Sequence, residues 1–231
     1  MKTAGIIGGL GPETTSKFYL ELILLCQRTP SVRRPPLIIY NVPITYEQER
    51  DEILHGACRA DTRQLLIDAA KKLETAGADF IVMLCNSLHV FTGDITGAVR
   101  IPFLSIIEAV AEFLKEQGIK RVGILSTRTT RDNKLYERLL DSCEVECTST
   151  TDLEQERLSE IILKLVRDKC TQEDRERLIE IIKRFEKAGV HDTVLACTDL
   201  QLLTPKVPQM RIHDTMKILA KVTADEILKE K

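Results

Sequence analysis

The sequence predicts an α/β protein made of two similar lobes, each built on a mainly parallel sheet. Two observations support this prediction. Short runs rich in β-branched residues alternate with longer amphipathic segments, and several sequence blocks recur in both halves of the 231 residues. Strands separated by helix-length segments are typical of βαβ units, whose strands pair in parallel. We therefore expect right-handed crossovers within each lobe.

Strand and helix predictions alternate along the chain. The segments predicted as strands are short and apolar: 2–7, 37–42, 79–84, 103–104, 121–126, 145–148, 193–196 and 210–212. The segments predicted as helices are longer: 12–27, 57–76, 106–117, 133–142, 153–169, 172–188 and 214–229. Pro12 suits the first turn of the first helix. In the second helix, Leu66, Ala69 and Leu73 recur at steps of three and four residues, as one helix face requires.

Three blocks of the first half recur in the same order in the second half. Ala-Gly-Ile-Ile at 4–7 matches Val-Gly-Ile-Leu at 122–125, Ala-Gly-Ala at 76–78 matches Ala-Gly-Val at 188–190, and Ile-Pro-Phe-Leu at 101–104 matches Val-Pro-Gln-Met at 207–210. Unrelated α/β halves also share glycine-then-strand patterns, but the common order favours a duplication. We expect Rossmann-like lobes over 1–102 and 103–212, related by pseudo-symmetry, with the active site in the interlobe cleft. The C-terminal helix, over 213–231, is expected to return to the first lobe.

The composition excludes several classes of function. Lys and Arg total 33 against 35 Asp and Glu, a net charge of −2, so we expect no nucleic-acid and no membrane partner. No apolar run approaches the roughly 18 residues of a spanning helix. The N-terminus leads directly into a strand, which argues against a signal peptide. Seven cysteines without CxxC spacing favour free thiols in a reducing cytoplasm, and no Cys or His spacing predicts a metal site.

Cys85 and Cys197 are the only cysteines at equivalent places in the two halves, each at the carboxyl end of a predicted strand. Ligands of open α/β sheets bind outside these strand ends, so two facing lobes would bring both thiols to one cleft. Asn86-Ser87 and Thr198-Asp199 follow at predicted helix starts, whose partial positive charge favours a thiolate. The other cysteines are expected to be packing or surface thiols: Cys26, Cys58, Cys143, Cys147 and Cys170.

Two thiols on opposite sides of one carbon suit the inversion of a stereocentre next to a carboxylate. One thiolate takes the α-proton from one face, and the opposite thiol supplies a proton to the other face. A single base would tend to return the proton to the face that it left. The two thiols exchange roles with the direction of the reaction, and they titrate as a unit.

A glycine-rich turn, Gly8-Gly9-Leu10-Gly11-Pro12, separates the first strand from the first helix. Backbone N–H groups of Gly9, Leu10 and Gly11 could hold a substrate carboxylate there. A dinucleotide fingerprint is the rival interpretation, but its third glycine is replaced by Thr14 and the second strand ends at Asn41 rather than an acid. A turn that binds no ligand is the other alternative.

These motifs resemble the aspartate/glutamate racemase family, and the aspartate racemase branch best. The resemblance covers nearly the whole chain and rests on Gly-Gly-Leu-Gly-Pro-Glu-Thr-Thr at 8–15, Met-Leu-Cys-Asn-Ser-Leu-His at 83–89 and Ala-Cys-Thr-Asp-Leu at 196–200. It implies two similar α/β lobes, no cofactor, and a homodimer. Cys85 and Cys197 would be the two catalytic bases. Glutamate racemases tend to open with Asp-Ser-Gly and carry His after the second Cys-Thr, and this chain has neither.

The resemblance also implies a set of substrate-binding residues. Asn86 and Thr198, with their neighbours Ser87 and Asp199, would hold the α-carboxylate and amine region. Asp199 stands where the family usually has Glu, and Leu88 stands where it usually has Ala, so the departures bear on substrate identity.

Further residues of the family pattern lie in the segment after the second predicted strand and in the second lobe. Arg50 would bind the substrate, and a second cation would come from Arg167, with Lys164 as its rival. Thr127 and Thr130, in the turn after the fifth strand, would also face the substrate.

The sequence thus predicts a cofactor-independent racemase of aspartate or a related acidic amino acid such as glutamate. Three alternatives remain: a hydantoin racemase, a relative of maleate isomerase or decarboxylase type, and a non-catalytic two-lobed protein that binds carboxylates. His89, which follows the first cysteine motif, is expected to be a structural residue rather than a ligand.

Overall fold

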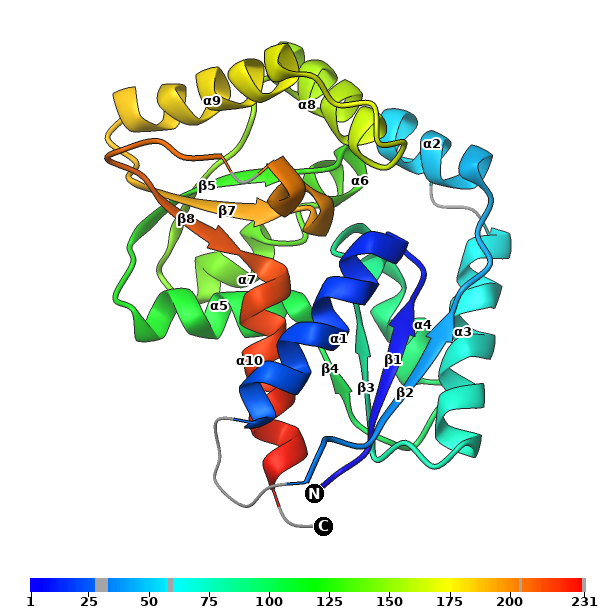
Figure 1. The fold of residues 1–231 in the computed structure, drawn as a ribbon. Coiled ribbons are helices and arrows are strands. Elements are labelled where there is room, and N and C mark those ends of the chain that lie inside the picture. Colours follow the sequence, from blue (N-terminus) through cyan, green and yellow to red (C-terminus); the bar gives the residue numbers. More distant parts are fainter. Residues whose placement is uncertain (28–32, 58–59, 204, 230–231) are drawn as a thin grey trace.

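The computed structural model describes residues 1–27, 33–57, 60–203 and 205–229. Cys58 and the last two residues of the predicted C-terminal helix lie outside these ranges. Two four-stranded sheets, each surrounded by helices, make up the described part (Figure 1). This confirms the predicted α/β class with mainly parallel sheets. No helix in the described ranges has the length and apolar character needed to cross a bilayer.

The first sheet has the strand order β2-β1-β3-β4, and all its pairs are parallel. Its strands are β1 (Ala4–Gly8), β2 (Leu37–Asn41), β3 (Phe80–Met83) and β4 (Phe103–Leu104). Its helices are α1 (Pro12–Gln27), α2 (Tyr46–His55), α3 (Ala60–Thr75) and α4 (Thr92–Thr96), and the 3₁₀ turn η1 (Ser87–Phe91) precedes α4. Because β1 and β3 are buried along their whole length, they read as continuous apolar runs.

The second sheet repeats this order as β6-β5-β7-β8, again with parallel pairs. Its strands are β5 (Arg121–Ser126), β6 (Glu146–Thr148), β7 (Asp192–Ala196) and β8 (Arg211–Asp214). The remaining helices are α5 (Ile106–Glu116), α6 (Arg128–Asp132), α7 (Glu137–Ser142), α8 (Asp152–Leu165), α9 (Gln172–Lys187) and α10 (Thr215–Leu228), with a 3₁₀ turn η2 (Thr198–Leu203). The shared strand order is what an internal duplication would produce.

The sheets do not divide the chain at the residues expected from the sequence. Strand β4 begins after residue 102 but belongs to the first sheet, because Phe103 pairs with Ile81 and Leu104 with Val82. Strand β8 extends to Asp214, two residues past the expected end of the second lobe. The assignment of the chain to two domains stays a prediction.

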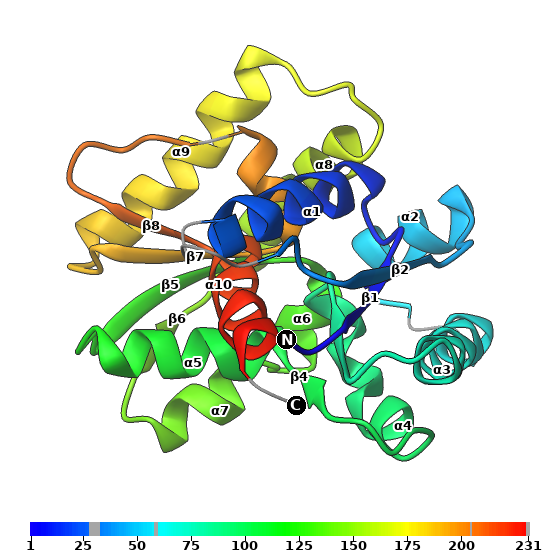
Figure 2. The ribbon, with the colours of Figure 1, turned by 60° about the horizontal axis from the view of Figure 1, so that its bottom comes forward.

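Helix α10 contacts both halves of the molecule. It packs against α1 of the first lobe and α5 of the second, and Figure 2 shows it between these two helices. Near its end, the carbonyl oxygen of Ile227 accepts a hydrogen bond from the N–H of Lys2 at 2.8 Å. The helix therefore returns to the first lobe, as expected, and also joins it to the second.

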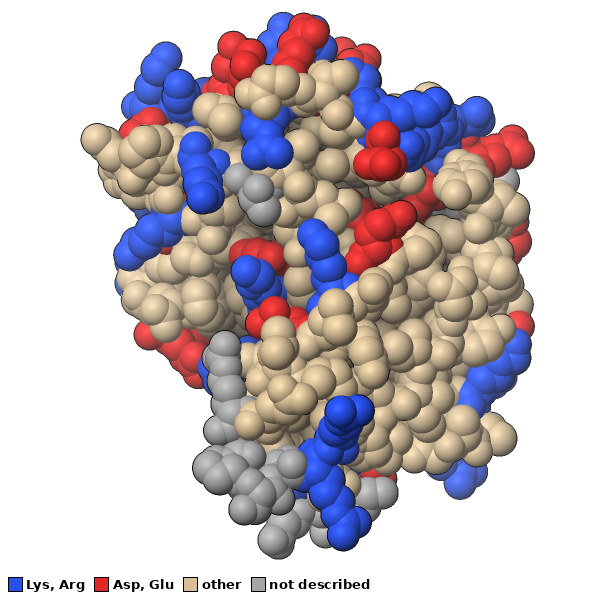
Figure 3. Space-filling model, viewed as in Figure 1, with Lys and Arg blue, Asp and Glu red and all other residues tan. Residues whose placement is uncertain are grey.

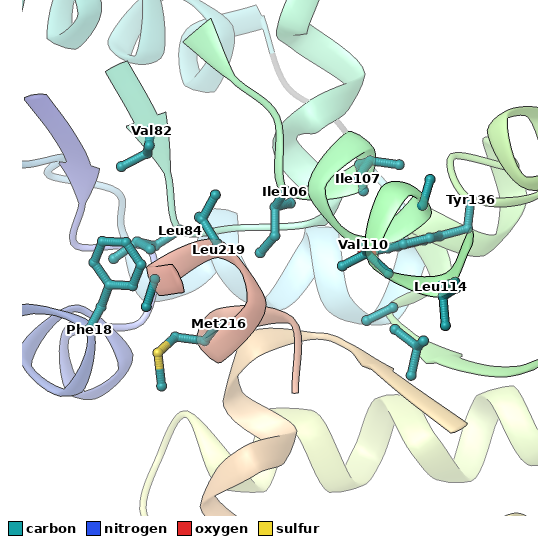
Figure 4. Close-up of a cluster of buried hydrophobic side chains, with 14 of the residues drawn as sticks. Phe18, Val82, Leu84, Ile106, Ile107, Val110, Leu114, Tyr136, Met216 and Leu219 are labelled. Carbon is teal, nitrogen blue, oxygen red and sulfur yellow. The ribbon is translucent and has the colours of Figure 1, made fainter. Parts of the chain in front are cut away.

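One apolar cluster crosses the boundary between the sheets (Figure 4). Phe18 and Val82 enter it from the first lobe, Val110 and Tyr136 from the second, and Leu219 from α10. All five side chains are fully buried. At roughly 1.5–3 kcal/mol per fully buried large apolar side chain, this shared core resists relative motion of the lobes.

Two helical segments differ from the sequence prediction. Of the predicted helix over 133–142, only α7 is helical, because Lys134 adopts a positive φ of 51° in the turn between α6 and α7. Helix α2 was not predicted. Thr45 and Gln48 start it with a capping box, in which each side chain accepts from the other residue's backbone N–H.

Candidate active site

Both cysteines singled out in the sequence line one cavity between the lobes. Cys85 follows β3 of the first sheet and Cys197 follows β7 of the second, so each lies at the carboxyl end of a central parallel strand. The space enclosed with them is about 430 Å³, including the part open to solvent. Its lining comes from both lobes, with Leu10 and Asn86 on one side and Thr127 and Thr198 on the other.

The Cys85 thiol lies among polar groups of the first lobe. Its Sγ is 3.7 Å from Ser87 Oγ, and the backbone N–H of Leu88 points toward it. These two contacts favour a thiolate, but burial and the neighbouring Glu52 carboxylate outweigh them and raise the pKa of Cys85. The balance of these effects favours the thiol form of Cys85.

The Cys197 thiol is 8% exposed and meets a similar set of groups. The N–H groups of Asp199 and Leu200 point toward the sulfur, whereas burial and the charges of Asp199 and Cys85 raise its pKa well above the ordinary value. The N–H groups at the start of each turn lower the pKa of the thiols, in the direction predicted from the sequence, but burial outweighs them. Each cysteine precedes a 3₁₀ turn of only five or six residues, whose N–H groups do not offset desolvation.

Hydrogen bonds to residues outside the first lobe's sheet hold the side chain of Asn86. Its Oδ1 accepts from Tyr136 Oη at 2.5 Å, and its Nδ2 donates to Thr215 Oγ1 at 3.2 Å. Asn86 lines the cavity, but one donor hydrogen at most remains for a ligand. Thr198, also in the lining, donates to the carbonyl of Leu84 at 3.4 Å and thereby links η2 to the end of β3.

A row of hydroxyl groups connects the second lobe to Cys85. Thr127 Oγ1 donates to Ser87 Oγ at 3.1 Å and lies 3.3 Å from Thr130 Oγ1. Thr127 and Ser87 line the cavity, as predicted. Thr130 is fully buried behind Thr127 and is absent from the lining, so it supports Thr127 rather than facing a ligand.

The glycine turn packs against Asp199 and does not form an open anion-binding site. Gly9 N–H donates to Thr15 Oγ1 at 3.1 Å, and Thr14 Oγ1 donates to Asp199 Oδ1 at 2.7 Å. At Gly11, where φ is +103°, a Cβ atom would come within 2.7 Å of Asp199 Oδ1. Leu10 lines the cavity itself, whereas Gly9 and Gly11 line an adjoining cavity.

The predicted substrate-binding cations do not reach the cavity lining. Arg50 points to solvent and pairs with Asp51 at 3.0 Å. Arg167 lies beyond the end of α8 and is exposed, although close enough to Glu49 to lower the pKa of that carboxyl. Lys164 pairs with Asp174 at 2.6 Å and is likewise absent from the cavity lining.

Carboxyl groups line the cavity in place of cations. Of these groups, only Asp199 was singled out in the sequence. Glu49 and Glu52 project from α2, and burial raises the pKa of each to about 7. Burial likewise raises the pKa of Asp199 to about 6. Figure 3 shows acidic side chains in the furrow between the start of α1 and α2. The signal in the sequence was the three-residue spacing of Glu49 and Glu52, which places both on one helix face.

His89 is a structural residue, as expected. Its Nε2 accepts from the backbone N–H of Ile106 at 3.2 Å, so its Nδ1 carries the proton and donates to the carbonyl of Cys85 at 2.7 Å. Burial lowers the pKa of His89 to about 4. Within the described ranges, no group of three or more His, Cys, Asp or Glu side chains is arranged to hold a metal ion.

Comparisons with known proteins point to one family. The model of a family described as Asp/Glu/Hydantoin racemase matches residues 7–223. The broad specificity amino-acid racemase RacX of Bacillus subtilis strain 168 is 29% identical over 233 residues, which cover 97% of each chain. Among solved structures, a putative Asp/Glu racemase from Yersinia pestis is 30% identical with a TM-score of 0.83, covering 99% of this chain and all of that one. An aspartate racemase homologue from Pyrococcus horikoshii OT3 is 29% identical with a TM-score of 0.79 at the same coverage.

Proposed function

Because the chain belongs to the Asp/Glu/hydantoin racemase family, and is thereby an isomerase, we propose that it interconverts the L and D forms of an amino acid with Cys85 and Cys197 as its two bases. The observation that carries this proposal is that the two thiols, one from each lobe, line the same cavity. In support, Cys85 is one of the groups that raise the pKa of Cys197.

In the proposed reaction, one cysteine is a thiolate and the other a thiol when substrate is bound. The thiolate removes the proton from Cα, and the electron pair of that bond delocalises into the α-carboxylate. The opposite thiol then donates its proton to the other face of Cα and becomes the thiolate. The product has the inverted configuration, and the two cysteines have exchanged protonation states.

Donors in the cavity would stabilise the charge that develops on the carboxylate. Candidates are the second amide hydrogen of Asn86 and the N–H groups that follow each cysteine. The substrate's α-ammonium group would lie beside a carboxylate of the lining, for which Asp199 is the candidate next to Cys197. Its positive charge would lower the pKa of the nearby thiols and so favour the reactive state.

Aspartate is the substrate that the sequence resemblance predicts, with glutamate as a close relative. Its side-chain carboxylate would require a cation, and Arg50 and Arg167 would have to turn inward to supply one. Cofactor independence, a homodimer and a cytoplasmic location are further proposals that rest on the same resemblance.

Proton exchange in D₂O tests the reaction. The protein is incubated with single L-amino acids, and the Cα–H signal and the optical purity are followed together. We expect exchange with loss of chirality for at least one of them, and loss of inversion in both Cys85→Ser and Cys197→Ser. Cys143→Ser, a half-buried cysteine outside the cavity, is the matched control and should keep the activity.

The outcomes separate the alternatives. Full inversion by either serine variant would contradict the two-base mechanism. Binding of amino acids without any exchange would identify a non-catalytic carboxylate-binding protein, and activity on a hydantoin alone would identify a hydantoin racemase.

A further inference from the structure

The charges that line the cavity are distributed along it rather than gathered at one point. Asp199 lies next to Cys197, and Glu52 lies next to Cys85, where it hydrogen-bonds Ser87. Glu49 is on the same face of α2, one turn before Glu52. A substrate whose Cα sits between the thiols therefore meets two carboxyl groups near its backbone and a third farther out.

In the described part of the protein, none of these three carboxyl groups is paired with a cation. Among the described residues, no Lys or Arg side chain forms a salt bridge with Glu49, Glu52 or Asp199, and no Lys, Arg or His lines the cavity. Arg167 acts on Glu49 from the exposed rim. A buried carboxylate without a cation is costly, so a ligand that brings positive charge is favoured over one that brings negative charge.

The cavity also continues past the third carboxyl group. Ile44, Glu49 and Val166 line both the cavity with the cysteines and an adjoining cavity of about 630 Å³. Glu13 also lines the adjoining cavity, and its charge acts on Glu49. A side chain that extends from Cα would pass the apolar groups of Ile44 and Val166 and end at Glu49, and Glu13 would add negative charge nearby.

The net charge of the amino acid distinguishes the candidate substrates. Aspartate carries a net charge of −1 and would bring a second carboxylate toward Glu49 and Glu52. Lysine, ornithine and arginine carry +1, with a chain of methylene groups between Cα and the cationic end. Their α-ammonium group would meet Asp199 or Glu52, and the second cation would meet Glu49.

From this lining, and resting on the proposed function, we infer that the site selects amino acids with a long cationic side chain, of the lysine, ornithine and arginine class. Glu49 is the specificity-determining residue for the distal cation. The same positive charges would lower the pKa of the two thiols, which burial and the carboxylates of Glu52 and Asp199 otherwise raise. Binding of such a substrate would therefore also promote thiolate formation.

The experiment compares substrates that differ only in the terminal charge. The kcat/KM of racemisation is measured for L-lysine against L-norleucine, for L-ornithine against L-norvaline, and for L-aspartate and L-glutamate. We expect each cationic substrate to exceed its neutral isostere, and both acidic amino acids, by at least tenfold. In Glu49→Gln, the lysine-to-norleucine ratio should fall about tenfold. Glu47→Gln, an exposed glutamate of the same helix, is the control and should leave the ratio unchanged.

Failure of this inference is distinguishable from failure of the proposed function. Racemisation that is fastest with aspartate or glutamate, or a ratio that Glu49→Gln leaves unchanged, overturns the substrate class while the two-thiol reaction stands. No exchange with any amino acid of the panel overturns the proposed function and this inference together.

Discussion

Tyr136 Oη donates a hydrogen bond to Asn86 Oδ1 at 2.5 Å, which ties the second lobe to the residue directly after Cys85. Asn86 in turn donates to Thr215 Oγ1, and Thr215 donates to the carbonyl of Leu195 at 2.9 Å, two residues before Cys197. A continuous buried network therefore joins the backbone at the two cysteines. It gives Tyr136 and Asn86 a positioning role, because the separation of the thiols depends on this network.

Removal of the Tyr136 hydroxyl should weaken both the fold and the site. In Tyr136→Phe, Asn86 Oδ1 is left buried without its donor, which costs about 1–3 kcal/mol of unfolding free energy. We expect kcat to fall more than KM changes, since the thiols rather than the ligand groups are displaced. Denaturant unfolding and racemisation kinetics measure the two effects. Tyr19→Phe, at a 42% exposed tyrosine, should change neither, and wild-type kcat in Tyr136→Phe would refute the positioning role.

Gly11 is required by the approach of Asp199 as well as by its own backbone conformation. In Gly11→Ala the new Cβ would meet Asp199 Oδ1, and the positive φ adds strain. We expect a loss of about 1–3 kcal/mol in unfolding free energy and a rise in KM, because Asp199 must move. Gly93→Ala is the control, since its Cβ meets nothing within 4 Å. Equal KM values for Gly11→Ala and the wild type would show that Asp199 does not contact substrate.

The sequence predicted the two lobes and the cysteine pair because both depend on long-range repetition. Cys85 and Cys197 occupy matching strand ends, and parallel strands place matching ends at the same edge of each sheet. The strand order of each sheet was not predicted, since alternation of strands and helices fits several orders.

The acidic lining was missed because it depends on the rotational phase of a short helix. Arg50 and Glu49 are neighbours in sequence, but successive helical residues point about 100° apart, so only one of them faces the cavity. The phase of α2 is set by Ile53, which packs into the core, and by the Thr45 cap. Similarly, the sequence could not decide between Lys164 and Arg167 as the second cation, because the ion-pair partner of Lys164, Asp174, lies on the next helix.

His89 should stay neutral far below the ordinary range of a histidine. Its folded-state pKa of about 4 lies under the unfolded value of about 6.5, so the neutral ring stabilises the fold above pH 6.5 and this stabilisation is lost as the pH falls toward 4. Imidazole NMR shifts, assigned with His89→Gln, should show an Nδ1–H tautomer at pH 6. Protonation of this ring near pH 6.5 would contradict the two hydrogen bonds that we assign to it.

Glu52 should make the protein less stable as the pH rises, which is the opposite of the usual behaviour of a carboxyl group. Its pKa is raised from 4.5 unfolded to about 7 folded, so the folded state binds the proton more tightly. The contribution of Glu52 to the unfolding free energy is therefore highest below pH 4.5 and falls until about pH 7, by about 3 kcal/mol at most. Glu49, with the same shift, adds to the slope.

Glu52→Gln replaces the carboxyl group by a neutral amide of nearly the same shape. We expect this variant to be more stable than the wild type at pH 8 and to have a flatter pH profile between 4.5 and 7. Denaturant midpoints across this range measure the difference, and Glu47→Gln on the exposed face should keep the wild-type slope. Parallel profiles for Glu52→Gln and the wild type would mean that the pKa of Glu52 is not raised and that its carboxyl group is ionised at pH 7. The uncompensated negative charge beside Cys85 would then already be present before any substrate binds.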